Sequence, residues 1–388
     1  MCPPTATLLS AGKDVYTAAQ MLTLHVAPAR RAGVTGLFTD DEYARRRATF
    51  ITEVTPTPLL RLPALAARLG LGELWVKDET SRFELPAFKS LGVEYAVAAL
   101  RQRGALAGVT TLVCASAGNH GRAVARAARV AGLQARIFLD ADVAEARVAA
   151  IAAEGAAIER VAGTYDDAVR LAAADAAACG ALVVSDTSWE GYTQVPHDIM
   201  LGYTHLMDEA EAAWASTGPP DVCMVQAGVG GLLAAVGSWL AWRYADERPR
   251  LIAVEPANAA CVLQSLRTGR AVPVLGPLTT IMAGLRCGEV SPLAFPVVRD
   301  LVDAAVAIDD SWCRAAMRTL AHPAGADMPL AVGTSGAAGV AALLALRACP
   351  DPAVAARLGL TGDARVMVIA TEGVTEPDLW REVTTAAE

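Results

Sequence analysis

Short apolar runs alternate with alanine-rich, helix-like stretches in the middle of the chain. In order from residue 110, the runs and the stretches between them are 111–116, 118–132, 135–140, 141–155, 156–161, 164–180 and 181–186. β-prone runs that alternate with helices are typical of βαβ units and of a parallel sheet. The pattern therefore predicts an α/β unit over residues 110–186.

A second alternating series follows the turn at 215–221. Its expected strands are 222–228, 250–256, 304–309 and 365–371, and its expected helices are 231–245, 311–321 and 336–348. Residues 74–79 are a further strand candidate. The stretch 268–300 is rich in glycine and proline and is expected to be loop, and long loops in compact domains are often functional.

The two series predict a chain of two α/β domains, and 388 residues are ample for both. We expect residues 92–195 to form a small domain that is inserted into a large one. The large domain then contains residues 1–91 and 196–388.

Composition excludes several classes of function. With 54% hydrophobic and 19% charged residues, the chain fits a globular enzyme, and no apolar run has the about 20 residues of a membrane span. We expect no signal peptide, because the start lacks a basic region leading into an apolar one. The net charge of −8, without a basic block, argues against nucleic acid as a partner. The chain contains neither a CxxC nor an HExxH motif, so no motif indicates a metal site. The unpaired spacing of the cysteines suggests a reduced, cytoplasmic setting.

Lysine is rare, and one of its positions suggests chemistry. Only three of the 33 basic residues are lysines, Lys13, Lys77 and Lys89. Lys89 falls in the first turn of a helix that Pro86 is expected to start. A lysine amine forms an imine with a carbonyl, and arginine cannot. A solvated lysine on a helix remains the alternative.

Two glycine-rich turns follow expected strands. Gly228, Gly230 and Gly231 come before a helix, where successive backbone N–H groups suit a phosphate. The spacing is not the GxGxxG of dinucleotide-binding loops. However, a dinucleotide site also has an acidic residue at the end of the next strand, and Glu255 lies there, so a nucleotide cofactor remains an alternative. The other turn carries Asn119, although it could also be an ordinary strand-to-helix connection.

Together, an imine-forming lysine, a phosphate cup and a side-chain amide fit pyridoxal 5′-phosphate (PLP). The lysine would hold the aldehyde, the cup would hold the phosphate, and the amide of Asn119 would contact the ring hydroxyl.

Longer segments resemble one family of PLP enzymes. The chain reads PTPLLRLPALAARLGLGELWVKDETSRFELPAFKSLG at 56–92, and later GNHGRAVA, SDTSWEGYTQVPHDIMLGY, QAGVGGL, VEPANAAC, TIMAGLRCGE and ATEG. These blocks resemble fold-type II PLP enzymes, the tryptophan synthase β and threonine dehydratase group. More closely, they resemble diaminopropionate ammonia-lyases. The resemblance implies two three-layer αβα domains with mainly parallel twisted sheets, the cofactor in the cleft between them, and a homodimer.

The resemblance also implies an activity and a set of site residues. The activity is α,β-elimination on 2,3-diaminopropionate, which gives pyruvate and ammonia through aminoacrylate. Lys89 is similar to the lysine that binds the cofactor, and Asp186 to the carboxylate that takes the Cα proton of the L-amino acid. The cofactor contacts implied are Asn119 for the ring hydroxyl, Gly228, Val229, Gly230, Gly231 and Leu232 for the phosphate, and Thr371 near the pyridine nitrogen. Thr334 and Ser335 are less favoured candidates for the last role.

The chain departs from the family pattern near the substrate. The family has an aspartate before GNHG that serves as base for the D-isomer, and here that position is Ala117. The family's RFGLNAFK is RFELPAFK here, with Glu84 and Pro86. The L-isomer is therefore the expected substrate, and the departures leave the natural substrate open.

Three alternatives remain from the sequence. One is a related lyase, dehydratase or β-replacement enzyme that acts on serine, threonine or another β-substituted L-amino acid. Another is a nucleotide-binding oxidoreductase, and the third is a PLP-binding protein without catalysis. Cys261 and Cys287 either form a redox-sensitive bridge near the site or remain buried free thiols.

Overall fold

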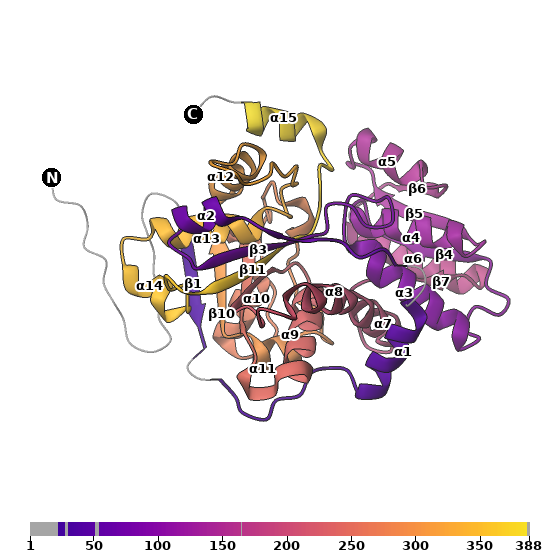
Figure 1. Cartoon of the computed structure of the whole chain (residues 1–388). Coiled ribbons are helices and arrows are strands. Elements are labelled where there is room, and N and C mark those ends of the chain that lie inside the picture. Colours follow the sequence, from indigo (N-terminus) through magenta and orange to yellow (C-terminus); the bar gives the residue numbers. More distant parts are fainter. Residues whose placement is uncertain (1–21, 28–29, 51–53, 164, 386–388) are drawn as a thin grey trace. The chain divides into compact units, whose positions relative to one another are not determined.

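Strands with apolar residues on both faces form the larger of two sheets in the computed structural model (Figure 1). The structure describes residues 22–27, 30–50, 54–163 and 165–385. Across the seven-stranded sheet the order is β1-β10-β9-β8-β11-β3-β2, with parallel pairing from β10 to β3 and an antiparallel strand at each edge. The strands are β1 (Leu22–Val26), β2 (Leu59–Arg61), β3 (Glu73–Asp78), β8 (Val222–Gln226), β9 (Arg250–Pro256), β10 (Ala304–Ile308) and β11 (Arg365–Ala370).

Helices cover both faces of this sheet because successive side chains of a strand point to opposite sides. On one face, Val76, Met224 and Val254 belong to a core that also contains residues of α2, α12, α13 and α14. On the other face, Trp75 stacks on Trp214 with ring centroids 5.9 Å apart. The helices are α2 (Pro63–Arg68), α8 (His205–Trp214), α9 (Gly231–Tyr244), α10 (Cys261–Thr268), α11 (Phe295–Leu301), α12 (Asp310–Ala321), α13 (Ala338–Ala348), α14 (Pro352–Arg357) and α15 (Pro377–Thr385), with short 3-10 turns η1 (Ala245–Glu247), η2 (Ala257–Ala259) and η3 (Ala283–Leu285).

The smaller sheet is entirely parallel and has the order β6-β5-β4-β7. Its strands are β4 (Thr111–Cys114), β5 (Gln134–Asp140), β6 (Ala157–Val161) and β7 (Leu182–Val183). Val113, Phe138 and Val161 pack against the alanines of α6. The helices of this unit are α1 (Asp40–Phe50), α3 (Lys89–Gln102), α4 (Asn119–Val130), α5 (Glu145–Ala152), α6 (Tyr165–Cys179) and α7 (Gln194–Tyr203).

The chain forms two compact units. The first contains the described residues up to Phe38, Pro56–Ser81 and the chain from Leu206 onward, and the second contains Thr39–Thr55 and Arg82–His205. Residues 92–195, the expected small domain, lie inside the second unit, which extends further at both ends and includes α1. Residues 1–21 of the expected large domain lie outside the described residues.

The expected strands and helices of both alternating series are present. The stretch 268–300, expected to be loop, is largely irregular, but it also contains η3 and the start of α11. Pro296 is the second residue of α11, where its missing N–H costs no intrahelical hydrogen bond. Among the helices of the described ranges, none combines the length and the apolar character that a membrane-spanning helix requires.

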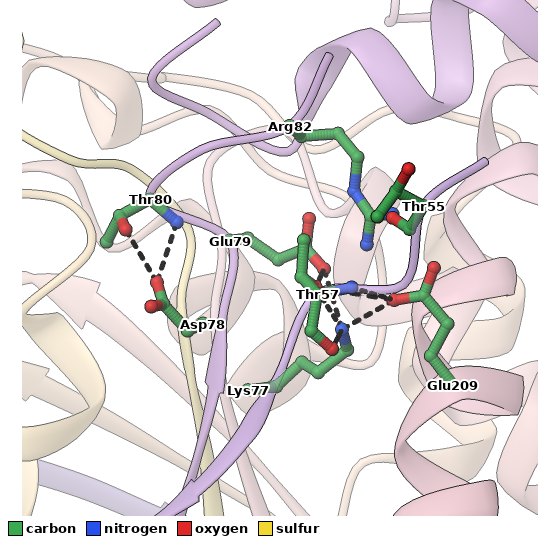
Figure 2. Close-up of polar contacts among 8 residues, drawn as sticks. All are labelled: Thr55, Thr57, Lys77, Asp78, Glu79, Thr80, Arg82 and Glu209. Carbon is green, nitrogen blue, oxygen red and sulfur yellow. Dashed lines mark hydrogen bonds and ion pairs between the residues drawn. The ribbon is translucent and has the colours of Figure 1, made fainter. Parts of the chain in front are cut away.

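A buried ionic cluster lies within the first unit, close in sequence to three points where the chain passes between the units. The Lys77 amine points between Thr57 and Glu209 in Figure 2, and it is 2.6 Å from Glu209 Oε2 and 3.1 Å from Glu79 Oε1. Nζ also donates to the Thr57 carbonyl at 2.8 Å, and the Thr57 hydroxyl donates to Glu79 at 2.7 Å. The charged side chains are at most 4% exposed. The cluster therefore holds these three chain segments together.

Replacing Lys77 by methionine is expected to destabilise the protein by about 3–5 kcal/mol, because the buried carboxylates of Glu79 and Glu209 both lose their contact with the Lys77 ammonium. Urea titration followed by tryptophan fluorescence measures the effect. The double variant Lys77→Met/Glu209→Gln also removes one of the two buried negative charges and should recover part of the loss. Equal unfolding midpoints for Lys77→Met and the unchanged protein would contradict this role.

Candidate active site

Lys89 is the first residue of α3, and its amine meets the carboxylate of Asp186. Nζ lies 2.5 Å from Asp186 Oδ2, and each side chain is 22% exposed. The amine also lies 5.3 Å from the ring centroid of Phe88 and 5.8 Å from that of Tyr203, within the range of cation–π attraction. The lysine and the carboxylate singled out from the sequence are therefore partners in one unit.

The loop after β7 fixes the backbone next to Asp186. The Tyr192 hydroxyl donates to the Val183 carbonyl at 3.0 Å and accepts from the Ser185 amide at 2.8 Å. The Tyr192 ring stacks on Trp189 with centroids 4.0 Å apart. One tyrosine thus ties the end of the strand to the turn that carries the carboxylate.

His120 is a site residue that the sequence reasoning missed. Its Nε2 lies 3.0 Å from the Val184 carbonyl and donates to it, and its Nδ1 lies 3.8 Å from Asp186 Oδ2. Burial lowers the pKa of His120, and the negative charge of Asp186 acts in the opposite direction. The available signal was its position, directly after Asn119 in the Gly-Asn turn.

The electrostatics keep Asp186 ionised. Burial alone raises the pKa of this carboxyl group, but the neighbouring His120 and Lys89, and the hydrogen bond from Lys89, outweigh burial and hold the pKa well below its usual range. Asp186 is therefore a carboxylate that can accept a proton.

Asn119 begins α4, and the turn before it has a tight backbone. A Cβ at Gly121 would come within 2.1 Å of the Ser116 carbonyl oxygen, so only glycine fits there. Gly118, at the N-cap, has open space where a side chain would be. Asn119 and Ala117 belong to the same unit as Lys89 and Asp186.

Glu84 and Pro86 lie in and after a tight turn before Lys89. Arg82 and Leu85 exchange backbone hydrogen bonds of 2.8 and 3.0 Å, and Phe83 and Glu84 between them have φ of 51° and 65°. Residues with a side chain rarely adopt this left-handed backbone region, which glycine occupies without strain. The Glu84 side chain is exposed, and α3 begins at Lys89 itself rather than at Pro86.

The glycine-rich loop is in the first unit, between β8 and α9. Gly230 is the N-cap of α9 with φ of 88°, and no side chain caps this end of the helix. A Cβ at Gly228 would lie 3.0 Å from Cys287 Sγ, and one at Gly230 would lie 3.1 Å from Val290. A helix N-terminus without a side-chain cap, preceded by a backbone with no room for side chains, is suited to a phosphate.

Thr371 lies in the same unit, directly after β11. It is 4% exposed, and its Oγ1 lies 2.8 Å from Gln226 Nε2. The structure therefore brings Lys89 and Asp186 together in one unit, and it places the glycine-rich loop and Thr371 in the other. An imine-forming amine, a glycine cradle and a buried hydroxyl fit PLP.

Glu255 is engaged in a structural role, which argues against a dinucleotide. Its carboxylate accepts from the backbone amides of Val262 and Leu263, both at 2.8 Å, at the start of α10. Burial raises its pKa to about 8. Both oxygens are therefore used within the fold, and neither is left for a ribose hydroxyl.

Neither Cys261 nor Cys287 forms a disulfide, and both lie near the glycine loop. Cys261 Sγ lies 3.5 Å from the Gly228 carbonyl, and burial raises the pKa of this thiol. A bridge between them stays a prediction. In the part of the chain that the structure describes, no group of three or more His, Cys, Asp or Glu side chains could hold a metal ion.

The chain matches known proteins over most of its length. Residues 51–372 match the family described as pyridoxal-phosphate dependent enzyme. Diaminopropionate ammonia-lyase of Escherichia coli K12 is 38% identical over 88% of this chain and 90% of its own.

Solved structures agree with this match. The crystal structure of the E. coli enzyme in complex with an aminoacrylate-PLP azomethine reaction intermediate has a TM-score of 0.88 and 35% identity, covering 94% of this chain and 97% of that one. A complex of the E. coli enzyme with D-serine has a TM-score of 0.85 at the same identity and coverage. These matches confirm the expected fold type II and the expected cofactor. The chain therefore belongs to the pyridoxal-phosphate dependent enzyme family and, within it, to the diaminopropionate ammonia-lyases.

Proposed function

We propose that this protein eliminates the β-amino group of 2,3-diaminopropionate, and that L-diaminopropionate is its substrate. The released aminoacrylate takes up water to give pyruvate and a second ammonia. The observation that carries the proposal is the 2.5 Å contact between the Lys89 amine and the Asp186 carboxylate. It pairs a group that can hold the cofactor with a group that can take a proton beside it.

Each residue has a role that its surroundings support. When bound, PLP withdraws electrons from the substrate and acidifies its Cα–H bond. Lys89 would hold the cofactor's aldehyde, the amides of Gly228, Val229, Gly230, Gly231 and Leu232 its phosphate, Asn119 its ring hydroxyl, and Thr371 its pyridine nitrogen. Asp186 accepts the Cα proton because it stays ionised.

The leaving β-amine also needs a proton. The Lys89 amine, next to Asp186, would be the group that supplies one. Its contact with Asp186 lets a proton pass from the carboxylate to the amine and then to the leaving group. His120, held by its bond to Val184, places its imidazole ring beside Asp186.

The proposal also covers the domain division, the cellular compartment and the oligomeric state. We propose a large domain that binds the phosphate and a small domain inserted into it that contains residues 92–195, and the support is that 92–195 lies in one compact unit, together with Lys89. The free thiols among the described residues are compatible with a reducing cytoplasm. A homodimer is proposed from the family resemblance.

We expect turnover of L-2,3-diaminopropionate to release two ammonia molecules for each pyruvate, with little turnover of the D-isomer. The Cα–H bonds of the two isomers point to opposite faces when the other substituents are held fixed, so one carboxylate cannot serve both. Ala117 offers no base for the second face, which costs about 10²–10⁴-fold in rate. A lactate-dehydrogenase-coupled pyruvate assay with a separate ammonia assay measures rates and stoichiometry for each isomer.

Serine and threonine belong in the same assay, because a dehydratase releases one ammonia for each keto acid. Faster turnover of serine or threonine than of L-diaminopropionate would favour that alternative. Ala117→Asp should raise the D-isomer rate, and Ala117→Asn, with the same shape and no base, should not. Comparable rates on both isomers by the unchanged protein would refute the assignment of a single base.

A further inference from the structure

We propose that Gln226 is a positioning residue that fixes the hydroxyl of Thr371 as a hydrogen-bond donor to the pyridine nitrogen of the cofactor. The inference rests on the proposed function, because it uses the role assigned there to Thr371. Every contact that carries it lies within the first unit.

Gln226 is the last residue of β8, and its side chain reaches across to β11. Its Nε2 lies 2.9 Å from the Ser335 carbonyl oxygen, 2.9 Å from the Ile369 carbonyl oxygen and 2.8 Å from Thr371 Oγ1. The side chain is 3% exposed, so these contacts replace water. The next residues along the chain are the glycine loop, so one strand end supplies both the phosphate loop and this amide.

The orientation of the amide follows from its neighbours. Two of the three oxygens are backbone carbonyls, which accept hydrogen bonds and cannot donate them. The donating NH₂ group must therefore face them, and Oε1 points away, buried and without a hydrogen-bond partner. A reversed amide would place oxygen against oxygen at two points.

The consequence for Thr371 is that its proton cannot point toward Gln226. An amide nitrogen has no lone pair to offer, so the Thr371 hydroxyl cannot donate toward Gln226. Its proton is left to point elsewhere, and its oxygen faces the amide. A hydroxyl held in this way is a ready donor to an unprotonated pyridine nitrogen.

The anchor on the other side of the amide is also fixed. The Ser335 amide donates to Glu372 Oε1 at 2.9 Å, and Ser335 Oγ accepts from the Gly284 amide at 3.0 Å. The Ser335 carbonyl that Gln226 contacts therefore has little freedom to move. Gln226 cannot turn away from Thr371 without losing two bonds to fixed carbonyls.

A double-mutant cycle tests this coupling. The variants are Gln226→Met, which keeps the length and removes the donor, Thr371→Val, which keeps the shape and removes the hydroxyl, and their combination. Cofactor affinity is measured by titrating the apoenzyme with PLP, and the pyridine nitrogen is observed by ¹⁵N NMR with ring-labelled PLP. The nitrogen resonance reports a hydrogen bond to that atom, which a purely structural role would not move.

We expect each single variant to weaken PLP binding by about threefold to tenfold, as the loss of one hydrogen bond does. Gln226→Met should shift the ¹⁵N resonance in the direction of Thr371→Val, and the double variant should match Thr371→Val alone. Thr371→Ser should restore both readouts. Gln264→Met, the same change at an exposed position of α10, should leave both unchanged.

Effects of Gln226→Met that are equally large with and without the Thr371 hydroxyl would overturn the inference. So would an unchanged ¹⁵N resonance in Gln226→Met or in Thr371→Val while PLP still binds, an outcome that leaves the proposed function intact. Failure of the unchanged protein to bind PLP would refute the proposed function itself. If Gln226→Met does not fold, Gln226→Asn, an amide one methylene shorter, takes its place in the cycle.

Discussion

Replacing Lys89 by arginine is expected to lower turnover of L-diaminopropionate by more than about 10³-fold, because the covalent anchor of the cofactor is lost. Arginine keeps the positive charge that faces Asp186, so the ion pair and the fold around α3 should remain. Its guanidinium cannot form a carbon–nitrogen double bond with an aldehyde. The measurement is the rate of pyruvate formation at saturating substrate.

The same lysine should carry a covalent label after hydride reduction of the PLP-bound protein. Mass spectrometry of the digested protein is expected to find a pyridoxyl group on the peptide that contains Lys89. Lys77 is an internal control, since its buried amine is committed to Glu79 and Glu209. A label on Lys77 or on Lys13, which lies outside the described residues, would contradict the assignment.

The parallel α/β core could be predicted because its signals are local. The strands of the smaller sheet are short β-prone runs between alanine-rich helices, and the larger sheet repeats this over 222–371. Gly230 could be read from its neighbours, since a glycine between a buried strand and a helix indicates a tight turn. Lys89 was identified by rarity, because arginine fills nearly every other basic position.

The buried ionic cluster could not be predicted, because its partners are far apart in the chain. Nothing near Lys77 in sequence indicates Glu209, 132 positions later. The contacts of the Gln226 amide could not be predicted for the same reason, because its partners Ser335, Ile369 and Thr371 are all more than 100 positions later in the chain. These groups acquire their roles only when the fold brings distant segments of the chain together.

The residues of the turn before Lys89 indicate a departure from the family pattern, but they do not indicate the geometry of the turn. In the sequence, Glu84 indicates only a change of side chain near the substrate. The structure adds that Phe83 and Glu84 both have positive φ, which costs about 1–2 kcal/mol for each residue that is not glycine. Backbone strain of this kind depends on the pair of hydrogen bonds between Arg82 and Leu85, and no local pattern of side chains reveals it.

Replacing Asp186 by asparagine is expected to lower turnover of L-diaminopropionate by about 10²–10⁴-fold while PLP still binds to Lys89. The amide has the same shape but cannot accept the Cα proton. A positioned base acts only if it is ionised, and His120 and Lys89 lower the pKa of Asp186 enough to keep it so. Rate assays are paired with the visible absorbance of the bound cofactor, and Asp142→Asn, an exposed change in the same unit, is the control.

The pH dependence of stability gives this assignment a second readout that does not involve turnover. Because the carboxyl pKa is lower in the folded protein than in the unfolded chain, the ion pair with Lys89 stabilises the apoprotein above the ordinary aspartate pKa, and this stability is lost as the pH falls toward the folded value. In Asp186→Asn, that part of the acid-induced loss of stability should disappear, whereas in Asp142→Asn it should remain. If Asp186→Asn keeps the pH dependence of stability of the unchanged protein and no longer binds PLP, Asp186 holds the cofactor rather than taking the proton. A full L-isomer rate in Asp186→Asn would mean that another group on the same face is the base.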